Sequence, residues 1–185
     1  MGTHLLLISG STRTGSTNTA ALRTLQQVAP QGISTHLYDE LTTLPAFVPG
    51  DDPSPPPVTR LRHHLAAADA VLFCTPEYAG LIPGALKNLL EWTVGTADLS
   101  AKPVAWITVA VPGRGDGATT SLRTVLGYVD ADIIESACTR IPILSADVAA
   151  DGTIPSPDIR THLATAAESL TAALPAQPKL PGATH

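Results

Sequence analysis

Short, continuous apolar runs alternate along the chain with longer stretches in which apolar residues return at helical spacing. The strongest runs are His4–Ser9, Ala70–Thr75 and Pro103–Val111, and weaker ones are Ser34–Tyr38 and Ile133–Ile143. An uninterrupted apolar run is typical of a strand that is buried on both faces, as in a parallel sheet. The pattern therefore predicts five buried strands.

Helical spacing fills the intervals between these runs. Residues 20–28 share one apolar face, and Pro30 and Gly32 end that helix. The other expected helices are Thr59–Asp69, Pro83–Thr93, Ala118–Val129 and Ile159–Leu174. Residues 45–57 are rich in proline, which removes a backbone donor and fixes φ, so a long surface loop is expected there.

The alternation of five strands with helices predicts an α/β fold: a doubly wound, five-stranded parallel sheet with helices on both faces. The strand order 2-1-3-4-5 suits five strands better than the six-stranded order. We expect one domain over residues 1–174 and a flexible C-terminal tail over residues 175–185. In this order ligands bind beyond the carboxyl ends of strands one and three, so the loops after residues 9 and 75 are the candidate site.

The loop over residues 10–18 (GSTRTGSTN) is dense in hydroxyl and amide groups and opens a helix. Free backbone amides at a helix start form an anion site, and an arginine can bind phosphate through two parallel hydrogen bonds. Phosphate binding is therefore expected of this loop, whose donors include Arg13 and hydroxyl groups such as that of Thr17. The alternative is that these residues only cap the helix and shape the turn.

Two familiar nucleotide motifs do not fit this loop. The near match to the Walker A pattern has Ser16 in place of its lysine, and no lysine occurs before Lys87, which disfavours a nucleoside triphosphatase. The dinucleotide pattern Gly-x-Gly-x-x-Gly is absent, which disfavours Rossmann-type NAD binding. A mononucleotide or another monophosphate remains.

Two further loops carry candidate ligand contacts. Residues 75–84 (TPEYAGLIPG) follow the third strand, and Tyr78 could line a flat ring there or pack on its own loop. Glu77 could be a catalytic acid, although a structural or solvated carboxylate is the more ordinary interpretation. Residues 113–117 contain three glycines, which permit close approach of a ligand to the backbone or form a plain flexible turn.

Composition narrows the classes of function. Lys plus Arg is 11 and Asp plus Glu is 16, so the net charge of −5 disfavours nucleic-acid and anionic-membrane partners. No apolar stretch approaches the ~20 residues that cross a bilayer. Cys74 and Cys138 form no metal or disulfide pattern, which indicates a reduced, cytoplasmic location. No metal site is predicted, and no side chain is assigned a catalytic role.

The pattern GSxRxxSxN at residues 10–18, with PEY at 76–78 and PGxLKNxxEW at 83–92, resembles the NADPH-dependent FMN reductase family. The similarity runs from about residue 4 to about residue 170 and implies a flavodoxin-like fold. It implies that the FMN phosphate is held by Ser11, Arg13, Ser16 and Asn18. It also implies that FMN's ring lies along Pro76, Glu77, Tyr78 and Ala79, mainly by backbone contacts, and faces Gly113, Arg114 and Gly115.

The resemblance implies an FMN-dependent NAD(P)H oxidoreductase. NADPH or NADH would pass hydride to FMN, and the electrons would go to a small molecule such as a quinone, an azo compound, a metal oxyanion or free flavin. Many members of this family carry Asn at the position of Ala79. The family also implies a homodimer or homotetramer through the 84–93 helix. Two alternatives stay open: a flavodoxin-like electron carrier, and a non-catalytic module that binds FMN or another phosphate.

Overall fold

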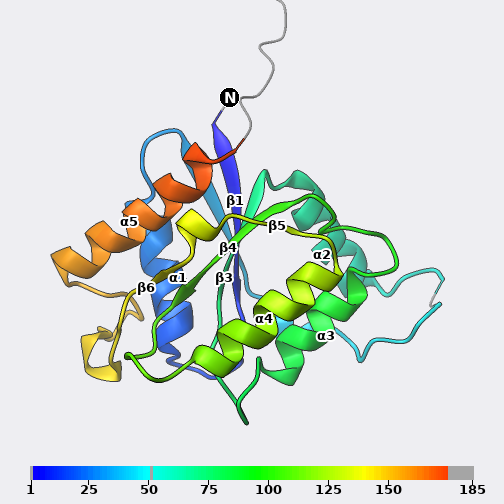
Figure 1. Cartoon of the computed structure of the whole chain (residues 1–185), viewed down its shortest axis with the longest axis horizontal. Helices are drawn as coiled ribbons and strands as arrows, with labels where there is room; N and C mark the ends of the chain where they lie inside the picture. Colours follow the sequence, from blue (N-terminus) through cyan, green and yellow to red (C-terminus); the bar gives the residue numbers. More distant parts are fainter. Residues whose placement is uncertain (1, 51, 175–185) are drawn as a thin grey trace, which may run out of the picture.

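The computed structural model describes residues 2–50 and 52–174, and in it one parallel sheet lies between two layers of helices (Figure 1). The strand order is β2-β1-β3-β4-β5, and the pairings between the named strands are parallel. The doubly wound order predicted from the sequence is therefore confirmed. The four long strands are β1 (Thr3–Ser9), β2 (Ile33–Tyr38), β3 (Ala70–Cys74) and β4 (Pro103–Thr108).

The fifth strand differs from the expected Ile133–Ile143. It is split into β5 (Asp132–Ile133) and β6 (Thr139–Arg140), which both pair with β4. One turn of 3₁₀ helix, Glu135–Ala137, carries the chain out of the sheet between them. The amide of Ala137 donates to the carbonyl of Ile134 at 3.0 Å, so this turn satisfies its own backbone and needs no ladder partner.

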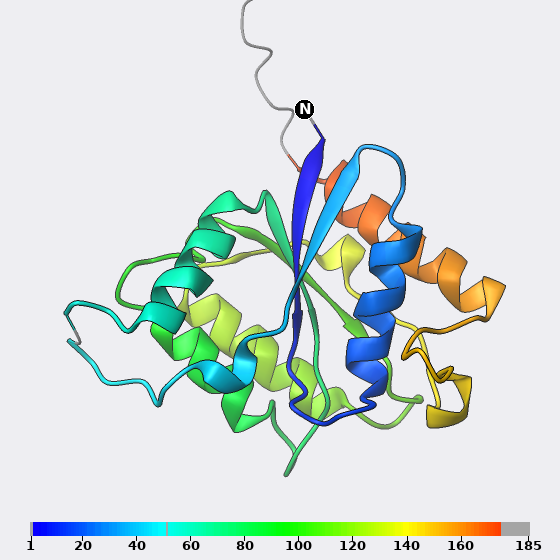
Figure 2. The same ribbon diagram turned by 180° about the vertical axis from the view of Figure 1, so that it is seen from behind.

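The helices divide between the two faces of the sheet. Figures 1 and 2 show α1 (Thr17–Val28) and α5 (Pro157–Ala172) side by side on one face. The other face is covered by α2 (Pro56–Ala67), α3 (Gly84–Trp92) and α4 (Asp116–Tyr128). The expected tail, residues 175–185, lies outside the described residues.

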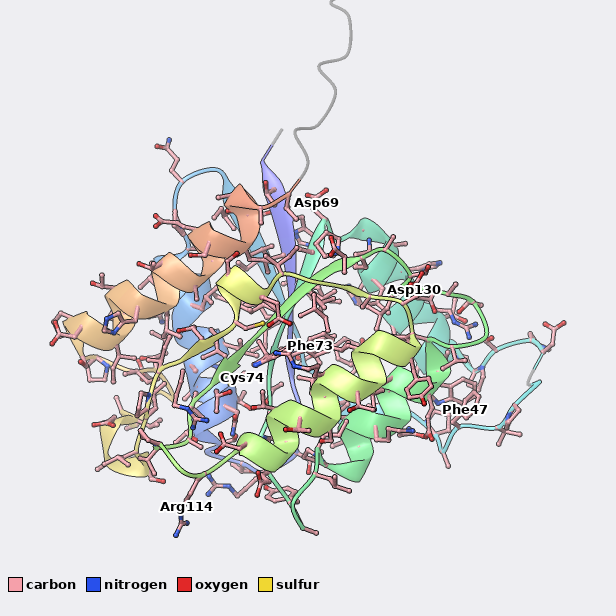
Figure 3. All side chains as sticks on the ribbon, in the orientation of Figure 1. Phe47, Asp69, Phe73, Cys74, Arg114 and Asp130 are labelled. Carbon is pink, nitrogen blue, oxygen red and sulfur yellow. The ribbon has the colours of Figure 1, made fainter. Side chains whose placement is uncertain are left out.

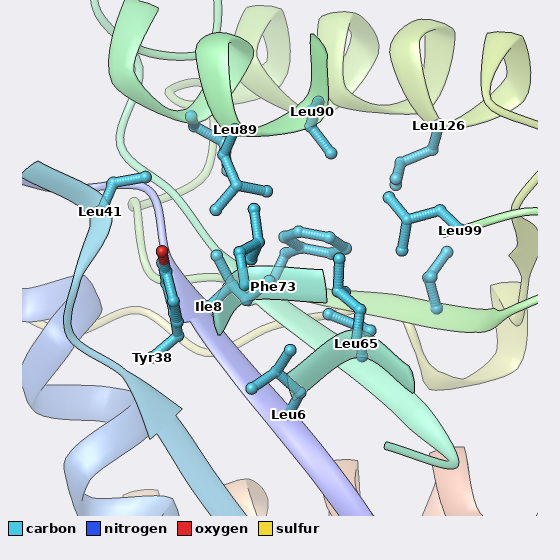
Figure 4. Close-up of a cluster of buried hydrophobic side chains, with 14 of the residues drawn as sticks. Leu6, Ile8, Tyr38, Leu41, Leu65, Phe73, Leu89, Leu90, Leu99 and Leu126 are labelled. Atoms are coloured by element: carbon cyan, nitrogen blue, oxygen red, sulfur yellow. The ribbon is translucent and has the colours of Figure 1, made fainter. Parts of the chain in front are cut away.

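Two hydrophobic clusters form the core, one on each face of the sheet. Alternate residues of β1 belong to different clusters: Leu5 and Leu7 pack toward α1 and α5, whereas Leu6 and Ile8 pack toward the other face. Figure 4 shows side chains of this second face meeting leucines from α3 and α4 around Phe73. Each fully buried leucine contributes about 1.5–3 kcal/mol, so strands that are apolar at every position hold both helical layers in place.

The Pro-rich segment is shorter than expected, because α2 begins at Pro56 rather than at Thr59. Pro56 and Pro57 occupy the first turn of α2, where a missing backbone N–H costs nothing. Similarly, Pro83 is the N-cap of α3 rather than its first helical residue. Both differences move a helix start by a few residues and leave the topology unchanged.

The 45–47 segment is held against α3 within the same chain. Asn88 accepts a hydrogen bond from the amide of Phe47 at 2.8 Å and donates one to the carbonyl of Pro45 at 2.9 Å. Trp92, which is buried, donates from Nε1 to the same carbonyl at 2.9 Å and meets the ring of Phe47 edge-on. Asn88 therefore joins α3 to the 45–47 segment of the same chain.

None of the helices in the described part of the chain has both the length and the apolar character that crossing a membrane requires.

Candidate functional site

The loops after β1 and β3 touch at the carboxyl edge of the sheet. The amide of Gly10 donates to the carbonyl of Cys74 at 2.9 Å. A Cβ added at Gly10 would lie 2.1 Å from Oγ1 of Thr75, so only glycine allows this approach. The two loops singled out by the strand order therefore share one edge of the molecule, as predicted.

The start of α1 is left open for an external anion. Ser16 is its N-cap, but no side chain caps the helix and its first turn contains no acidic residue. The hydroxyl groups stabilise the loop instead. The hydroxyls of Ser9 and Thr19 are hydrogen-bonded to each other at 2.8 Å, and the amide of Ser11 donates to Oγ of Ser9 at 3.3 Å. Helix capping therefore does not explain the loop, and the first amides of α1 remain available as donors.

Two cavities adjoin this helix start. The first has a volume of about 400 Å³ and is lined by three of the residues predicted to bind phosphate. They are Ser11, Arg13 and Ser16. The second has a volume of about 520 Å³ and contains seven predicted residues drawn from three loops. They are Thr17, Asn18, Pro76, Glu77, Gly113, Arg114 and Gly115.

Six further residues line the second cavity and were missed by sequence reasoning: Thr75, Val109, Ala110, Val111, Ile143 and Leu144. Four of these side chains are the larger aliphatic ones, valine, isoleucine and leucine, so one wall of the cavity is apolar. Ile143 and Leu144 follow β6, and their place beside the loop after β4 depends on the parallel pairing of β6 with β4. Nothing in their local sequence signals a ligand.

Tyr78 and Ala79 line neither cavity, because they form a protruding hairpin turn. Tyr78 and Leu81 exchange backbone hydrogen bonds at 3.0 and 3.1 Å. Ala79 and Gly80 between them have φ of 51° and 79°, the left-handed pair that defines a tight type I′ turn. The side chains of Tyr78 and Leu81 are 48% and 58% exposed. Contact of Tyr78 and Ala79 with a ligand therefore stays a prediction.

Glu77 joins the loop after β3 to the start of α4. Its Oε2 accepts a hydrogen bond from the amide of Ala118 at 3.1 Å. A Cβ added at Gly117 would lie 2.1 Å from the carbonyl oxygen of Gly80, so a glycine is needed where the hairpin rests on α4. A carboxylate at a helix N-terminus is favoured by the helix dipole. The geometry therefore supports the structural interpretation of Glu77.

Arg140 organises the loop after β4 and was not anticipated. Its Nη1 donates to the carbonyls of Ala110, Val111 and Arg114 at 2.8, 3.1 and 2.7 Å. Its Nη2 donates to Oδ1 of Asp116 at 2.5 Å. One guanidinium thus holds both sides of a loop that lines the second cavity. The Arg114 side chain makes no hydrogen bond or ion pair within the described residues, and Figure 3 shows it projecting from the carboxyl edge.

The thiol of Cys74, which lies near this site, is unreactive. Cys74 is fully buried, and its Sγ donates to Oδ1 of Asn18 at 3.3 Å. Burial raises the pKa of the Cys74 thiol far above its ordinary value, so it remains protonated and does not act as a nucleophile. Within residues 2–50 and 52–174, no three His, Cys, Asp or Glu side chains gather as a metal site would require.

In a comparison with known proteins, residues 3–141 match the NADPH-dependent FMN reductase family. An NAD(P)H-dependent FMN reductase of Pseudomonas aeruginosa is 39% identical over 134 residues, covering 68% of this chain and 70% of that protein. A 2-hydroxy-1,4-benzoquinone reductase of Burkholderia is 32% identical over 170 residues, covering 89% and 92%. FerB, a flavoenzyme NAD(P)H:(acceptor) oxidoreductase of Paracoccus denitrificans, superposes with a TM-score of 0.75 at 25% identity, covering 92% and 98%.

Proposed function

This chain belongs to the NADPH-dependent FMN reductase family, and we propose that it is an FMN-dependent NAD(P)H oxidoreductase that delivers electrons to a quinone. The observation that carries the proposal is the pair of cavities at the open start of α1, at the edge where the loops after β1, β3 and β4 meet. All twelve residues expected to bind FMN lie within the matched range 3–141.

The residues present fit FMN. The uncapped start of α1 suits a phosphate, because its free amides and its dipole both favour an anion. Gly113 has a φ of +81°, and a Cβ built on it would meet nothing within 4 Å. The backbone at the cavity wall is therefore open to a flat ring. A cavity of about 520 Å³ with a polar end and an apolar wall is typical of a small-cofactor site.

One group of residues is assigned to the phosphate of FMN and a second group to its ring. The phosphate is held by Ser11, Arg13, Ser16, Thr17 and Asn18. The ring is contacted by the backbone of Pro76 and Glu77 on one side and by Gly113, Arg114 and Gly115 on the other, with Tyr78 and Ala79 at the rim. Bound FMN supplies the redox chemistry by accepting a hydride and passing it on.

The residues of the chain orient the bound FMN and exclude water from it. Val109, Val111, Ile143 and Leu144 form an apolar wall of the second cavity, which keeps solvent from the reacting ring. Among the described residues that line this cavity, Glu77 is the only carboxylate and no histidine, lysine or cysteine occurs. Since Glu77 already binds the amide of Ala118, no general base is assigned.

A quinone is the proposed acceptor because relatives are named for quinones and because an apolar wall suits an uncharged ring. An azo compound, a metal oxyanion or free flavin is the next choice. The homodimer or homotetramer through the 84–93 helix remains a proposal, supported by Val94, which is 60% exposed directly after α3. A cytoplasmic location stays a prediction, in keeping with the free thiols of Cys74 and Cys138.

A visible spectrum of the purified chain with FMN, followed by anaerobic titration with NADH and NADPH, tests the proposal. The flavin absorption should be present after gel filtration, should bleach on adding either nicotinamide, and should return on adding a quinone. A protein that stays colourless with FMN, or that oxidises no nicotinamide with any acceptor, would contradict the function. Flavin that binds but is not reduced directly by NAD(P)H would identify an electron carrier instead.

A further inference from the structure

The second cavity opens to solvent between two apolar side chains and a cation. Val111 and Leu144 line this cavity and are 38% and 58% exposed. Arg114, on the loop between β4 and α4, also lines it and is exposed, and Figure 3 shows its side chain at the carboxyl edge of the sheet. Lining residues that are exposed mark the opening of a cavity. A second substrate therefore reaches the proposed flavin site past these three residues.

The main chain of Arg114 is fixed although its side chain is free. Its amide donates to the carbonyl of Val111 at 3.1 Å, and its carbonyl accepts from Nη1 of Arg140 at 2.7 Å. The next residue, Gly115, has a φ of +83°, and a Cβ added there would lie 3.0 Å from Cβ of Ala110. The loop therefore holds an arginine in place at the cavity opening while its guanidinium stays available to a ligand.

The positive charge of Arg114 is not neutralised by the carboxylates around it. Within residues 2–50 and 52–174 its side chain makes no hydrogen bond or ion pair. The described carboxylates on or near the segments that line the cavity bind other donors. They are Glu77 with the amide of Ala118 at 3.1 Å, Asp116 with Nη2 of Arg140 at 2.5 Å, and Asp147 with the amide of Leu144 at 2.7 Å. The start of α4 at Asp116 adds the positive end of a helix dipole beside Arg114.

The guanidinium of Arg114 has no role in holding FMN in the proposed function. The FMN phosphate is assigned to the loop over residues 11–18, and the ring to the backbone of residues 113–115. The charge therefore remains for the second substrate. A neutral quinone gains little from a nearby guanidinium, whereas an anionic oxygen gains a charge-assisted hydrogen bond. An anion that enters beside the apolar side chains of Val111 and Leu144 also needs such a partner, because burying an unpaired charge is costly.

We propose that Arg114 selects, among quinones, those that carry a negative charge at neutral pH, such as hydroxyquinones with an ionised hydroxyl group. The inference rests on the proposed function. The ring of the acceptor packs against Val111 and Leu144, and its anionic oxygen accepts from the guanidinium of Arg114. The acceptor becomes the hydroquinone by taking a hydride from reduced FMN and a proton from water. Arg114 stays protonated throughout, so it binds and positions the acceptor and transfers no proton.

The test compares two naphthoquinones, lawsone and menadione, as acceptors for the FMN-loaded full chain with NADH. They share one ring system and differ at a single position, where lawsone has a hydroxyl group that is ionised at neutral pH and menadione has a methyl group. Arg114→Gln should lower the ratio of kcat/KM for lawsone to kcat/KM for menadione about threefold to tenfold, the effect of losing one exposed charge-assisted contact. Because each quinone is compared with itself in the two proteins, their different reduction potentials cancel.

Further variants and salt separate the charge of Arg114 from a structural role. Arg114→Lys retains the charge and should keep most of the wild-type ratio, whereas Arg114→Glu should lower the ratio below that of Arg114→Gln. Added NaCl should lower the wild-type ratio, because exposed charges are screened by salt, and should affect Arg114→Gln less. The matched control is Arg160→Gln, which removes the same charge from α5 outside the cavity lining and should have the wild-type ratio.

An unchanged ratio in Arg114→Gln would overturn the proposal, whether both activities persist or both fall together. An equal fall of the ratio in Arg160→Gln would overturn it as well, because the effect would then come from the net charge. If the wild type reduces neither quinone, the proposed function fails by itself. The selectivity is then tested by binding alone: lawsone should quench the flavin fluorescence of the FMN-loaded chain, with a Kd that rises in Arg114→Gln and not in Arg160→Gln. The same Kd in both variants would rule the selectivity out.

Discussion

Arg13 projects from an exposed position in the loop before α1, and its side chain has no partner within residues 2–50 and 52–174. A guanidinium in this state is free to bind a phosphate through two parallel hydrogen bonds. Arg13→Ala should therefore raise the Kd for FMN about tenfold or more and leave the Kd for riboflavin, which has no phosphate, unchanged. Fluorescence titration with both flavins measures the difference. Equal effects on the two ligands would remove Arg13 from the phosphate site.

Ala79 occupies a backbone conformation that disfavours it. Its φ of 51° lies in the left-handed region, where a Cβ crowds the following carbonyl. Asn tolerates this region and Asn-Gly is the preferred type I′ pair, so Ala79→Asn should raise the free energy of unfolding by about 0.5–1 kcal/mol. Chemical denaturation measures it. The same substitution within α5, Ala164→Asn, should lower the stability instead, and two changes of equal sign would contradict the turn argument.

At the scale of elements, the loop between β4 and α4 depends on a residue of β6. Arg140 satisfies three carbonyls of that loop and the Asp116 carboxylate, a set that the single ammonium of lysine cannot reproduce. Arg140→Lys should weaken FMN binding about tenfold by loosening the cavity wall. Arg123→Lys, which alters the surface pair with Glu135, is the matched control. Loss of FMN binding in the control alone, or in neither variant, would contradict this role.

The contact between β2 and α2 is sensitive to pH. The rings of His36 and His64 stack with centroids 4.3 Å apart. Burial and the neighbouring His64 lower the pKa of His36 below its ordinary 6.5, although Asp39 and Glu40 act in the opposite direction. The folded state thus prefers neutral His36, and its contribution to stability is complete above pH 6.5 and decreases as the pH falls through and below that value.

Urea unfolding from about pH 7.5 to about pH 5.5 measures this dependence. The free energy of unfolding should fall toward the acidic end, and His36→Gln should flatten the curve. Carboxylates elsewhere titrate at lower pH, so they alter the acidic limb in both proteins equally. A His36→Gln curve with the wild-type slope would contradict the assignment.

The proposed oligomer through the 84–93 helix is a property of the whole molecule. Sedimentation velocity should show a dimer or a tetramer, since the apolar side chain of Val94 lies exposed beside α3. Val94→Glu should shift the protein toward monomer, because a charge in an apolar interface is costly. Val48→Glu, at another half-exposed valine on the 45–57 segment, should not. A wild type that sediments as a monomer would contradict the interface.

Much of the fold could be predicted because its determinants are local. The run Leu5–Ile8 is buried on both faces wherever it lies, so its apolar pattern alone requires a central strand. Pro30 directly follows the C-cap Ala29 and ends α1 through its own backbone chemistry. The hydrogen-bond donors of the loop at residues 10–18 indicate an anion site. Helix starts were less certain, since Pro56 can occur either in a loop or in a first turn.

What the sequence determined by itself is therefore the set of elements, their order in the sheet, and the loops that meet at its carboxyl edge. Only the tertiary structure decided which distant groups lie together: Arg140 beside the loop of Ala110, and Leu144 beside the second cavity. The physical reason is that burial periodicity and turn chemistry are carried by neighbouring residues. The partner of a side chain, in contrast, depends on how whole elements pack.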